Sequence, residues 1–236
     1  KIIFIQGDLN NQIKLDIKFE IIYHLATDTL GSPNKDLKIY STNMIDGLIM
    51  LKKNFISDVT KKFIFLSSGA VYGDKLNLKF KESDTNFKNF FEPNHHYGCL
   101  KLFSEHYLWS IFKNSKIQFF IFRIFAVYGA YQSLDSHFFI ANLIKSIIHR
   151  SKVSFNTDCK IFRNYIHIDD LVDQIIKISN LKTKFITLNL GSINLRLDNL
   201  ACKMTKKYGI DLEFGSEINL TRKYYIPDLV KLKSEK

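Results

Sequence analysis

Residues 63–73, FIFLSSGAVYG, pass from four consecutive apolar residues straight into a pair of serines and a glycine-containing turn. A strand that is apolar at every position is buried on both faces, as in a parallel sheet covered by helices. Similar apolar runs alternate along the chain with segments in which apolar residues recur at helical spacing. The predicted strands are 2–5, 21–25, 63–66, 118–125, 153–155, 185–190 and 211–214, and the predicted helices are 37–55, 96–112, 137–149, 170–178 and 197–208. This alternation predicts an α/β fold with a doubly wound parallel sheet.

Polar residues follow several of these predicted strands at the point where each strand ends. Asp8 follows the first run, residues 24–27 close the second, and Ser67–Ser68 close the third. Ligands of doubly wound sheets bind beyond the carboxyl ends of the strands. We therefore expect the functional site at this edge, with the polar loops 28–36 and 74–94 beside it.

The segment 97–101, YGCLK, places a phenol and an amine four residues apart in a predicted helix. Side chains at that spacing lie on one face of a helix. An ammonium near a phenol favours the phenolate, so Tyr97 beside Lys101 can exchange a proton with an alcohol or a ketone. Ser68, delivered by the neighbouring strand, can hold the reacting oxygen. The alternative is that the serine pair only forms a turn.

The chain has 236 residues and a formal net charge of +11, which admits nucleic acid, a membrane surface or a phosphate-bearing substrate as partner. Its lysines are scattered in short pairs such as Lys52–Lys53 and Lys206–Lys207 rather than gathered in a tail. We expect no nucleic-acid partner, and a basic nucleic-acid-binding module stays as a third hypothesis that the charge alone supports. Glu82 and Glu105 are expected to be solvated.

Three widely separated cysteines, Cys99, Cys159 and Cys202, form no C-x-x-C pair, and their odd number argues against a disulfide framework. A reducing compartment, and so the cytoplasm, is the expected location. No apolar run reaches the roughly 18 residues of a spanning helix, so we expect no membrane partner. His95 and His96 have no carboxylate or cysteine at convincing ligand spacing, so no metal site is expected.

Taken in chain order, the motifs resemble those of the extended short-chain dehydrogenases/reductases, a family that includes nucleotide-sugar epimerases, dehydratases and ketoreductases. The resemblance covers nearly the whole chain. It is carried by residues 4–9 FIQGDL, 24–27 HLAT beside the family's H-L-A-A, Asn43, 67–73 SSGAVYG beside S-S-x-x-V-Y-G, the Y-x-x-x-K pair at 97–101, 123–129 RIFAVYG beside R-x-x-N-x-Y-G, 163–170 RNYIHIDD beside R-D-Y-I-H-V-x-D, and 225–228 YIPD beside a late Y-x-x-D segment.

The resemblance implies an NAD- or NADP-dependent enzyme that moves a hydride at a sugar carbon of a nucleotide-diphosphate sugar, with Ser68, Tyr97 and Lys101 as its catalytic set. The coenzyme-binding residues that it implies are Asp8, Leu9, Leu25, Ala26, Thr27, Asn43, Ser67, Tyr97 and Lys101. The implied substrate-binding residues are Ser68, Ala70, Arg163 and Arg222. By analogy with the family, the helices 37–55 and 96–112 would form the interface of a homodimer.

Departures from the family pattern narrow the expected activity. Gly69 and Ala70 stand where family dehydratases commonly carry an acidic pair, so an epimerase or a 4-ketoreductase is favoured over a dehydratase. Ala126 replaces the usual Asn, so an amide contact to the substrate nucleotide is lost or supplied elsewhere. The ten glycines include no G-x-x-G-x-x-G spacing, the turn whose N–H groups approach the coenzyme pyrophosphate. We therefore expect a fragment of such an enzyme or a degenerate gene product, and a non-catalytic remnant of the same fold is the alternative function.

The expected domain division places a partial dinucleotide-binding domain in residues 1–125, with residues 160–192 returning to it. Residues 126–159 and 193–236 are expected to form a small, interleaved substrate-binding part. The two parts are not separated by a clean linker.

Overall fold

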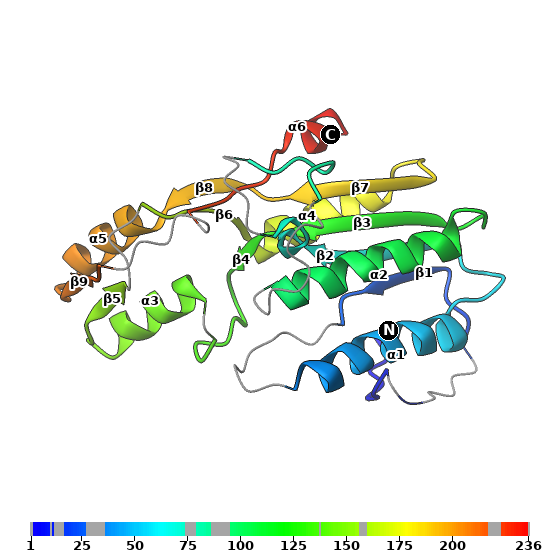
Figure 1. Ribbon diagram of the computed structural model, residues 1–236, viewed down its shortest axis with the longest axis horizontal. Coiled ribbons are helices and arrows are strands. Elements are labelled where there is room, and N and C mark those ends of the chain that lie inside the picture. Colours follow the sequence, from blue (N-terminus) through cyan, green and yellow to red (C-terminus); the bar gives the residue numbers. More distant parts are fainter. Residues whose placement is uncertain are drawn as a thin grey trace.

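The computed structural model describes residues 2–9, 11, 17–26, 36–73, 79–85, 95–136, 138–155, 160–216 and 223–235. At its centre is a four-stranded parallel sheet in the order β1-β2-β3-β7 (Figure 1). These strands are β1 (Ile21–His24), β2 (Lys62–Ser68), β3 (Gln118–Ile124) and β7 (Phe185–Leu190). All three pairings are parallel, as the apolar runs predict, and the carboxyl ends of β2 and β3 coincide at Ser68 and Ile124.

Helices cover both faces of this sheet, which confirms the doubly wound fold. One face packs against α1 (Leu37–Phe55) and α2 (His96–Phe112), and the other against α4 (Ile168–Ser179) (Figure 1). Successive side chains of a strand point to opposite faces, so one apolar run supplies both cores. The core under α1 and α2 includes Phe63, Phe65, Phe119 and Ile121, whereas the core under α4 includes Ile64, Phe120, Phe122 and Leu188.

A second group of elements extends from one end of the sheet (Figure 1). Strand β6 (Phe162–His167) lies parallel to and between β10 (Tyr224–Tyr225) and β4 (Ala126–Tyr128), and β8 (Ile193–Arg196) pairs with it antiparallel. The remaining elements are α3 (Phe139–Ile148), β5 (Val153–Phe155), α5 (Leu197–Tyr208), β9 (Leu212–Phe214), η1 (Gly69–Tyr72) and α6 (Val230–Ser234).

The C-terminal chain returns toward the carboxyl end of β2. After β10, Pro227 forms a parallel bridge with Phe80, and the Phe80 N–H donates to the carbonyl of Ile226 at 2.9 Å. Phe80 belongs to one buried cluster with Val71 and Tyr72 of η1, the turn that follows β2. Residues near the end of the chain thereby come next to the serine pair.

The strand predicted at residues 2–5 is not formed. Ile2 is 97% exposed and Phe4 is 89% exposed, and no described residue pairs with this segment in a β-ladder. A strand requires a partner for its N–H and C=O groups, so apolar composition alone does not make one. The neighbouring edge strand β1 also leaves Ile21 and Tyr23 largely exposed.

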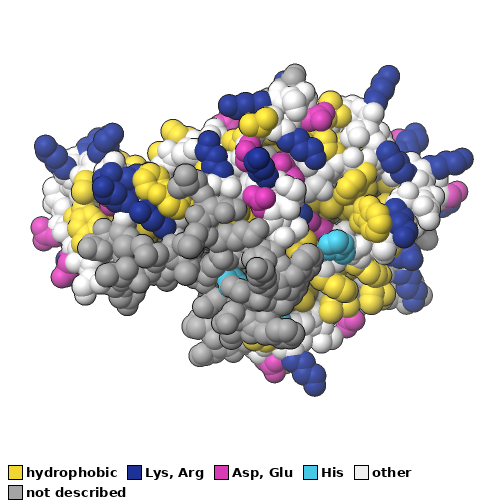
Figure 2. All heavy atoms as spheres, turned by 45° about the horizontal axis from the view of Figure 1, so that its top comes forward, with side chains coloured by type: hydrophobic (Ala, Val, Ile, Leu, Met, Phe, Trp, Pro, Cys, Tyr) yellow, Lys and Arg dark blue, Asp and Glu magenta, His cyan; other side chains and the backbone are white. Residues whose placement is uncertain are grey.

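Charged side chains are dispersed over the face of the molecule that Figure 2 shows. Figure 2 shows Lys and Arg side chains in several separate groups on one face, with Asp and Glu among them. None of the helices in the described ranges has the length and apolar character needed to cross a membrane. Those ranges also contain no group of three or more His, Cys, Asp or Glu side chains arranged to hold a metal ion.

Candidate active site

Ser68 and Tyr97 meet at the carboxyl end of β2. Ser68 is the last residue of β2, and its Oγ accepts a hydrogen bond from the Ala70 N–H at 3.1 Å, which caps η1. Tyr97 lies in the first turn of α2, with its phenol beside the Ser68 hydroxyl. Burial raises the pKa of Tyr97, and the interaction with the Ser68 hydroxyl lowers it in part. Tyr97 thus carries its proton at neutral pH.

Lys101 lies one helical turn beyond Tyr97 and is only 2% exposed. Its Nζ donates to the carbonyl of Leu66 at 3.0 Å and lies 5.9 Å from the centre of the Tyr97 ring. Burial lowers the pKa of Lys101 to about 8, against the opposing effect of Glu105. At neutral pH this side chain is therefore still mostly a cation, fixed next to the phenol.

Gly98 allows the close approach that brings Tyr97 to Ser68. A Cβ on Gly98 would lie 2.1 Å from the carbonyl oxygen of Ala70 and 2.8 Å from its carbonyl carbon. Real Cβ atoms do not come so close to a backbone, so any other residue would push α2 away from η1. The glycine inside Y-G-C-L-K therefore has a packing reason that is independent of chemistry.

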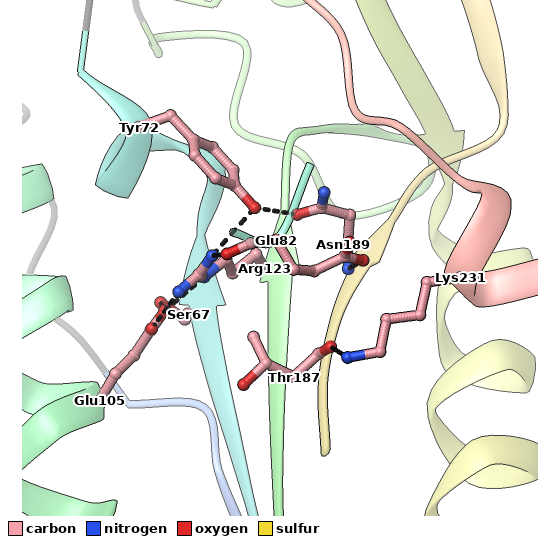
Figure 3. A network of polar contacts seen from close by, with 8 residues as sticks. All are labelled: Ser67, Tyr72, Glu82, Glu105, Arg123, Thr187, Asn189 and Lys231. Carbon is pink, nitrogen blue, oxygen red and sulfur yellow. Dashed lines mark hydrogen bonds and ion pairs between the residues drawn. The ribbon is translucent and has the colours of Figure 1, made fainter. Parts of the chain in front are cut away.

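A buried ion pair lies behind the serine pair (Figure 3). Glu105 of α2 is 4% exposed and accepts two hydrogen bonds from Arg123 of β3, at 3.0 Å from Nε and 2.6 Å from Nη2. The Ser67 hydroxyl donates to the same carboxylate at 2.5 Å. Glu105 thus ties the end of β2 to α2 and β3. The expectation that Glu105 is solvated was wrong, because Glu105 follows Lys101 by one more helical turn and faces the sheet with it.

The same network continues from Arg123 through Tyr72 to Asn189 on the neighbouring strand β7 (Figure 3). Arg123 Nη1 donates to the Tyr72 hydroxyl at 3.0 Å and to the carbonyl of Glu82 at 2.8 Å. Burial raises the pKa of Tyr72 to about 12, and its hydroxyl donates to Asn189 of β7 at 2.6 Å. The Glu82 carboxylate accepts from the Asn189 N–H at 2.8 Å, so Glu82 is not simply solvated either.

A cavity of about 460 Å³ opens beside Lys101 at the ends of β1 and β2. Several residues of the predicted coenzyme set line it, namely Asp8, Leu9, Ala26, Asn43 and Lys101. Leu25, Ser67 and Tyr97 are not part of that lining: Leu25 is 58% exposed, Ser67 turns its hydroxyl to Glu105, and Tyr97 lies beside Ser68. Thr27 lies outside the described residues.

His24 lines the same cavity and is an addition to the predicted set. It is 7% exposed, and its ring stacks on Phe65 with 5.6 Å between the centroids. Burial first, and the charge of Lys101 second, lower the pKa of His24 to about 4. The cavity wall is thus neutral at this position above that pH.

Acid should destabilise the fold through His24. The unfolded chain takes up a proton on this histidine below its ordinary pKa of about 6.5, whereas the folded chain does so only near pH 4. Its contribution is therefore present above about pH 6.5 and is lost as the pH falls. We expect unfolding experiments at pH 7 and pH 4 to show a loss on the order of 3 kcal/mol from this residue.

His24→Phe, which keeps an aromatic ring on Phe65, should show a smaller loss between the two pH values. His149→Gln, at an exposed position, should behave as the parent does. Parallel loss in the parent and in His24→Phe would contradict the assignment.

Two of the predicted substrate residues, Ala70 and Arg163, lie in η1 and β6. Ala70 is half-buried in η1, directly after the serine pair. Arg163 of β6 donates to the carbonyl of Phe162 at 2.8 Å and to that of Lys223 at 3.3 Å. Arg222 lies outside the described residues.

Tyr225 is a second phenol at the serine pair that the sequence patterns did not single out as a site residue. Its side chain lies near Ser68, and its ring lies against Phe125 with 4.6 Å between the centroids. A Cβ on Gly69 would meet the Tyr225 hydroxyl oxygen at 2.7 Å and Phe125 Cζ at 2.9 Å. The only sequence signal was the late Y-x-x-D segment, which gave the tyrosine no role.

Comparisons with known proteins agree with this architecture. A curated UDP-glucose 4-epimerase from Mycoplasma genitalium is 27% identical over 221 residues, which cover 84% of this chain and 64% of that protein. A dTDP-D-glucose 4,6-dehydratase from Dictyostelium discoideum is 29% identical over 165 residues, which cover 66% of this chain and 37% of that protein. The chain thus spans less than two thirds of the length of either relative.

Solved structures of similar fold include two epimerases. A UDP-N-acetylglucosamine 4-epimerase from Methanobrevibacter ruminantium superposes with a TM-score of 0.77 at 24% identity, over 98% of this chain and 73% of that one. A UDP-glucuronic acid 4-epimerase from Bacillus cereus, solved with UDP-glucuronic acid and NAD, gives 0.73 at 25% identity, over 91% and 68%. The family model described as the NAD dependent epimerase/dehydratase family matches residues 1–191. The chain therefore belongs to the NAD dependent epimerase/dehydratase family.

Proposed function

We propose that the chain is the larger part of an NAD(P)-dependent nucleotide-sugar epimerase or 4-ketoreductase in which Tyr97 is the acid/base. The observation that carries this proposal is that the Tyr97 phenol lies beside Ser68 at the carboxyl end of β2, with the Lys101 Nζ 5.9 Å from the centre of the Tyr97 ring. All three lie beyond the carboxyl ends of parallel strands, where ligands of such sheets bind. A general base must be within hydrogen-bond reach of the proton that it takes, and Ser68 marks that position.

The proton chemistry follows from these three side chains. Ser68 holds the reacting sugar oxygen next to Tyr97, and Tyr97 takes the proton when that oxygen becomes a carbonyl and returns it in the reverse step. Lys101, a cation below its pKa of about 8, stabilises the phenolate to which Tyr97 must ionise before it can take that proton.

The coenzyme would lie in the cavity beside Lys101. NAD or NADP, when bound, supplies the site that accepts and returns the hydride. Asp8 and Asn43 offer polar groups, and Leu9 and Ala26 offer apolar surface, which suits a nucleoside. Residues 1–125 with 160–192 would be the coenzyme-binding part.

Epimerase or reductase chemistry is favoured over dehydration by the packing around Gly69. Dehydration requires a group that removes a carbon-bound proton and expels water. An acidic side chain at position 69 would collide with the Tyr225 hydroxyl and with Phe125. The curated relatives include both an epimerase and a dehydratase, so they do not favour either reaction. The argument for an epimerase or reductase therefore depends on the residues around Ser68.

A nucleotide-diphosphate sugar is the proposed substrate. Arg163 provides the cationic side chain for the diphosphate, with Ala70 against the sugar and Arg222 as a further candidate. Residues 126–159 and 193–236 would be the substrate-binding part. We also propose a homodimer through α1 and α2, because Ile39, Ile49 and Phe103 leave apolar surface exposed on these helices.

Calorimetry tests the proposal and its alternative, a non-catalytic remnant of the same fold. The specific observation that favours the remnant is that the ten glycines include no G-x-x-G-x-x-G spacing. We expect the full-length protein to bind NAD or NADP at micromolar concentration and to convert a UDP- or dTDP-sugar, followed by NMR of the sugar. Residues 1–236 alone should bind the coenzyme weakly or not at all, because the pyrophosphate lacks its backbone N–H donors. Full-length protein that binds coenzyme but converts no sugar from a panel of nucleotide sugars would favour the remnant.

A further inference from the structure

Two consecutive turns of α2 are hydrogen-bonded to two consecutive residues of β2. The Lys101 Nζ donates to the carbonyl of Leu66 at 3.0 Å. One helical turn further along, the Glu105 carboxylate accepts the hydrogen of the Ser67 hydroxyl at 2.5 Å. The next residue of β2 is Ser68, which holds the sugar oxygen in the proposed reaction. The helix that carries Lys101 is thus attached to the strand immediately before that serine.

Arg123 fixes the Glu105 carboxylate from the neighbouring strand (Figure 3). Its Nε and Nη2 donate to the two carboxylate oxygens at 3.0 and 2.6 Å, and a two-point contact of this kind leaves a carboxylate little freedom to turn. Arg123 is also the residue of β3 that lies opposite Ser67 in the parallel register. The strands β2 and β3 and the helix α2 therefore meet at one carboxylate.

Glu105 does not itself line the site of the proposed reaction. Its side chain is 5% exposed, and it is not among the residues that line the coenzyme cavity beside Lys101. Its hydrogen-bond donors, Ser67 and Arg123, also lie outside that lining. An effect of Glu105 on the reaction therefore has to act through the end of β2 that it holds and through Lys101, one turn away on the same helix.

We propose that Glu105 is a positioning residue: through the Ser67 hydroxyl it holds the end of β2 in the arrangement that proton transfer requires. The two groups that flank Ser67 in the strand are the Leu66 carbonyl, which binds Lys101, and the Ser68 hydroxyl. A displacement of about 1 Å in such a site can cost about 10²-fold in rate. This inference rests on the proposed function in taking Ser68 and Lys101 as parts of the catalytic set.

The test uses two buried serines in the full-length protein. Ser67→Ala removes only the hydroxyl that Glu105 binds and leaves the ion pair with Arg123 complete. Ser179→Ala is the matched control, because Ser179, the last residue of α4, is 2% exposed against 4% for Ser67, and its Oγ donates to the carbonyl of Ile176 at 2.9 Å. An effect that comes only from losing a buried hydroxyl would appear in both variants.

We expect Ser67→Ala to lower kcat about tenfold with little change in the KM for the sugar, because the loosened strand end shifts by less than about 1 Å. The Kd for the coenzyme, measured by calorimetry, should stay at the parent value. Ser179→Ala should keep all three parent values. Coenzyme binding that weakens in Ser67→Ala while kcat is kept would mean that Ser67 serves the coenzyme, as the family resemblance implies, and would overturn the inference.

The pKa of Lys101 supplies a second measurement, which requires no turnover. Burial is the largest cause of its lowered pKa of about 8. Once the end of β2 loosens, water reaches the amine, so Ser67→Ala should raise this pKa by about one unit toward its ordinary value of 10.5, a fraction of the roughly 3–5 units that full burial can impose. The titration is followed by ¹³C NMR of the lysine side chains without coenzyme, as the difference from the same protein carrying Lys101→Arg.

The groups that surround Lys101 allow this shift to be interpreted. Among the described residues, the titratable and charged side chains around Lys101 and its neighbour on α2 are Tyr97, Glu105, His24, Asp8 and Arg123. Ser67→Ala changes none of them, and His24, with a pKa of about 4, is neutral throughout the titration. A Lys101 pKa that stays at about 8 in Ser67→Ala overturns the inference, whether or not kcat falls.

The two measurements separate this inference from the proposed function. If no protein, the parent included, converts a nucleotide sugar but Ser67→Ala shows the expected pKa shift, the proposed function alone is contradicted. If the parent converts the sugar normally and Ser67→Ala shows no shift, the positioning role of Glu105 alone is contradicted.

Discussion

Replacing Tyr97 with Phe in the full-length protein is expected to lower the conversion of nucleotide sugar by about 10²- to 10⁴-fold, the range of a lost general acid/base. The hydroxyl is the only group removed, and it lies beside Ser68, where the sugar oxygen is expected. The ring remains to pack beside Lys101, so coenzyme affinity should change little. The measurement is steady-state turnover together with calorimetry of coenzyme binding.

Tyr107→Phe is the matched control for this substitution. Tyr107 lies on the same helix, and its ring stacks on Phe103 with 6.2 Å between the centroids. Turnover should be unaffected there, because the helix keeps its packing and the site keeps its phenol. If Tyr97→Phe retained half of the parent turnover, another group would have to be the acid/base, and the catalytic assignment of Tyr97 would be wrong.

Long periodic segments could be predicted from the sequence to the residue. Helices α1, α2 and α5 and strand β7 have the bounds that apolar spacing predicts. The strands β4, β6, β8 and β10 were not predicted, because they are short, half-buried in part and paired mainly with one another. Residues 2–5 show the opposite error: their apolar composition favours a strand, but no described strand pairs with them.

Within the site, what is local in sequence could be predicted and what depends on tertiary contact could not. Tyr97 and Lys101 share a helix face by spacing alone. Glu105 continues that spacing, yet its burial depends on Arg123 arriving from β3, so composition suggested a solvated carboxylate. Tyr225 reaches Ser68 only because β10 pairs with β6, and no pattern in the sequence announces that pairing.

The Glu105–Arg123 ion pair allows the sharpest stability prediction. Both side chains are nearly inaccessible to solvent, at 5% and 6% exposure, so neither can be rehydrated if the other is removed. Glu105→Leu leaves the Arg123 guanidinium buried without its carboxylate and removes the acceptor of the Ser67 hydroxyl. We expect urea denaturation to show a loss of about 3–5 kcal/mol in the free energy of unfolding.

The double substitution Glu105→Leu with Arg123→Met distinguishes a charge effect from lost packing. It removes both ions, so no uncompensated charge stays buried, and it should be clearly more stable than Glu105→Leu alone. Tyr72 still has its bond to Asn189 at 2.6 Å in that variant, which limits the number of polar groups left unsatisfied. Asp135→Asn weakens an exposed pair with Lys145 and should leave the free energy of unfolding nearly unchanged. The single variant Arg123→Met completes the comparison. If the stability losses of Glu105→Leu and Arg123→Met simply added in the double variant, the two side chains would be energetically uncoupled. The network in Figure 3 would then be stabilised by packing rather than by charge.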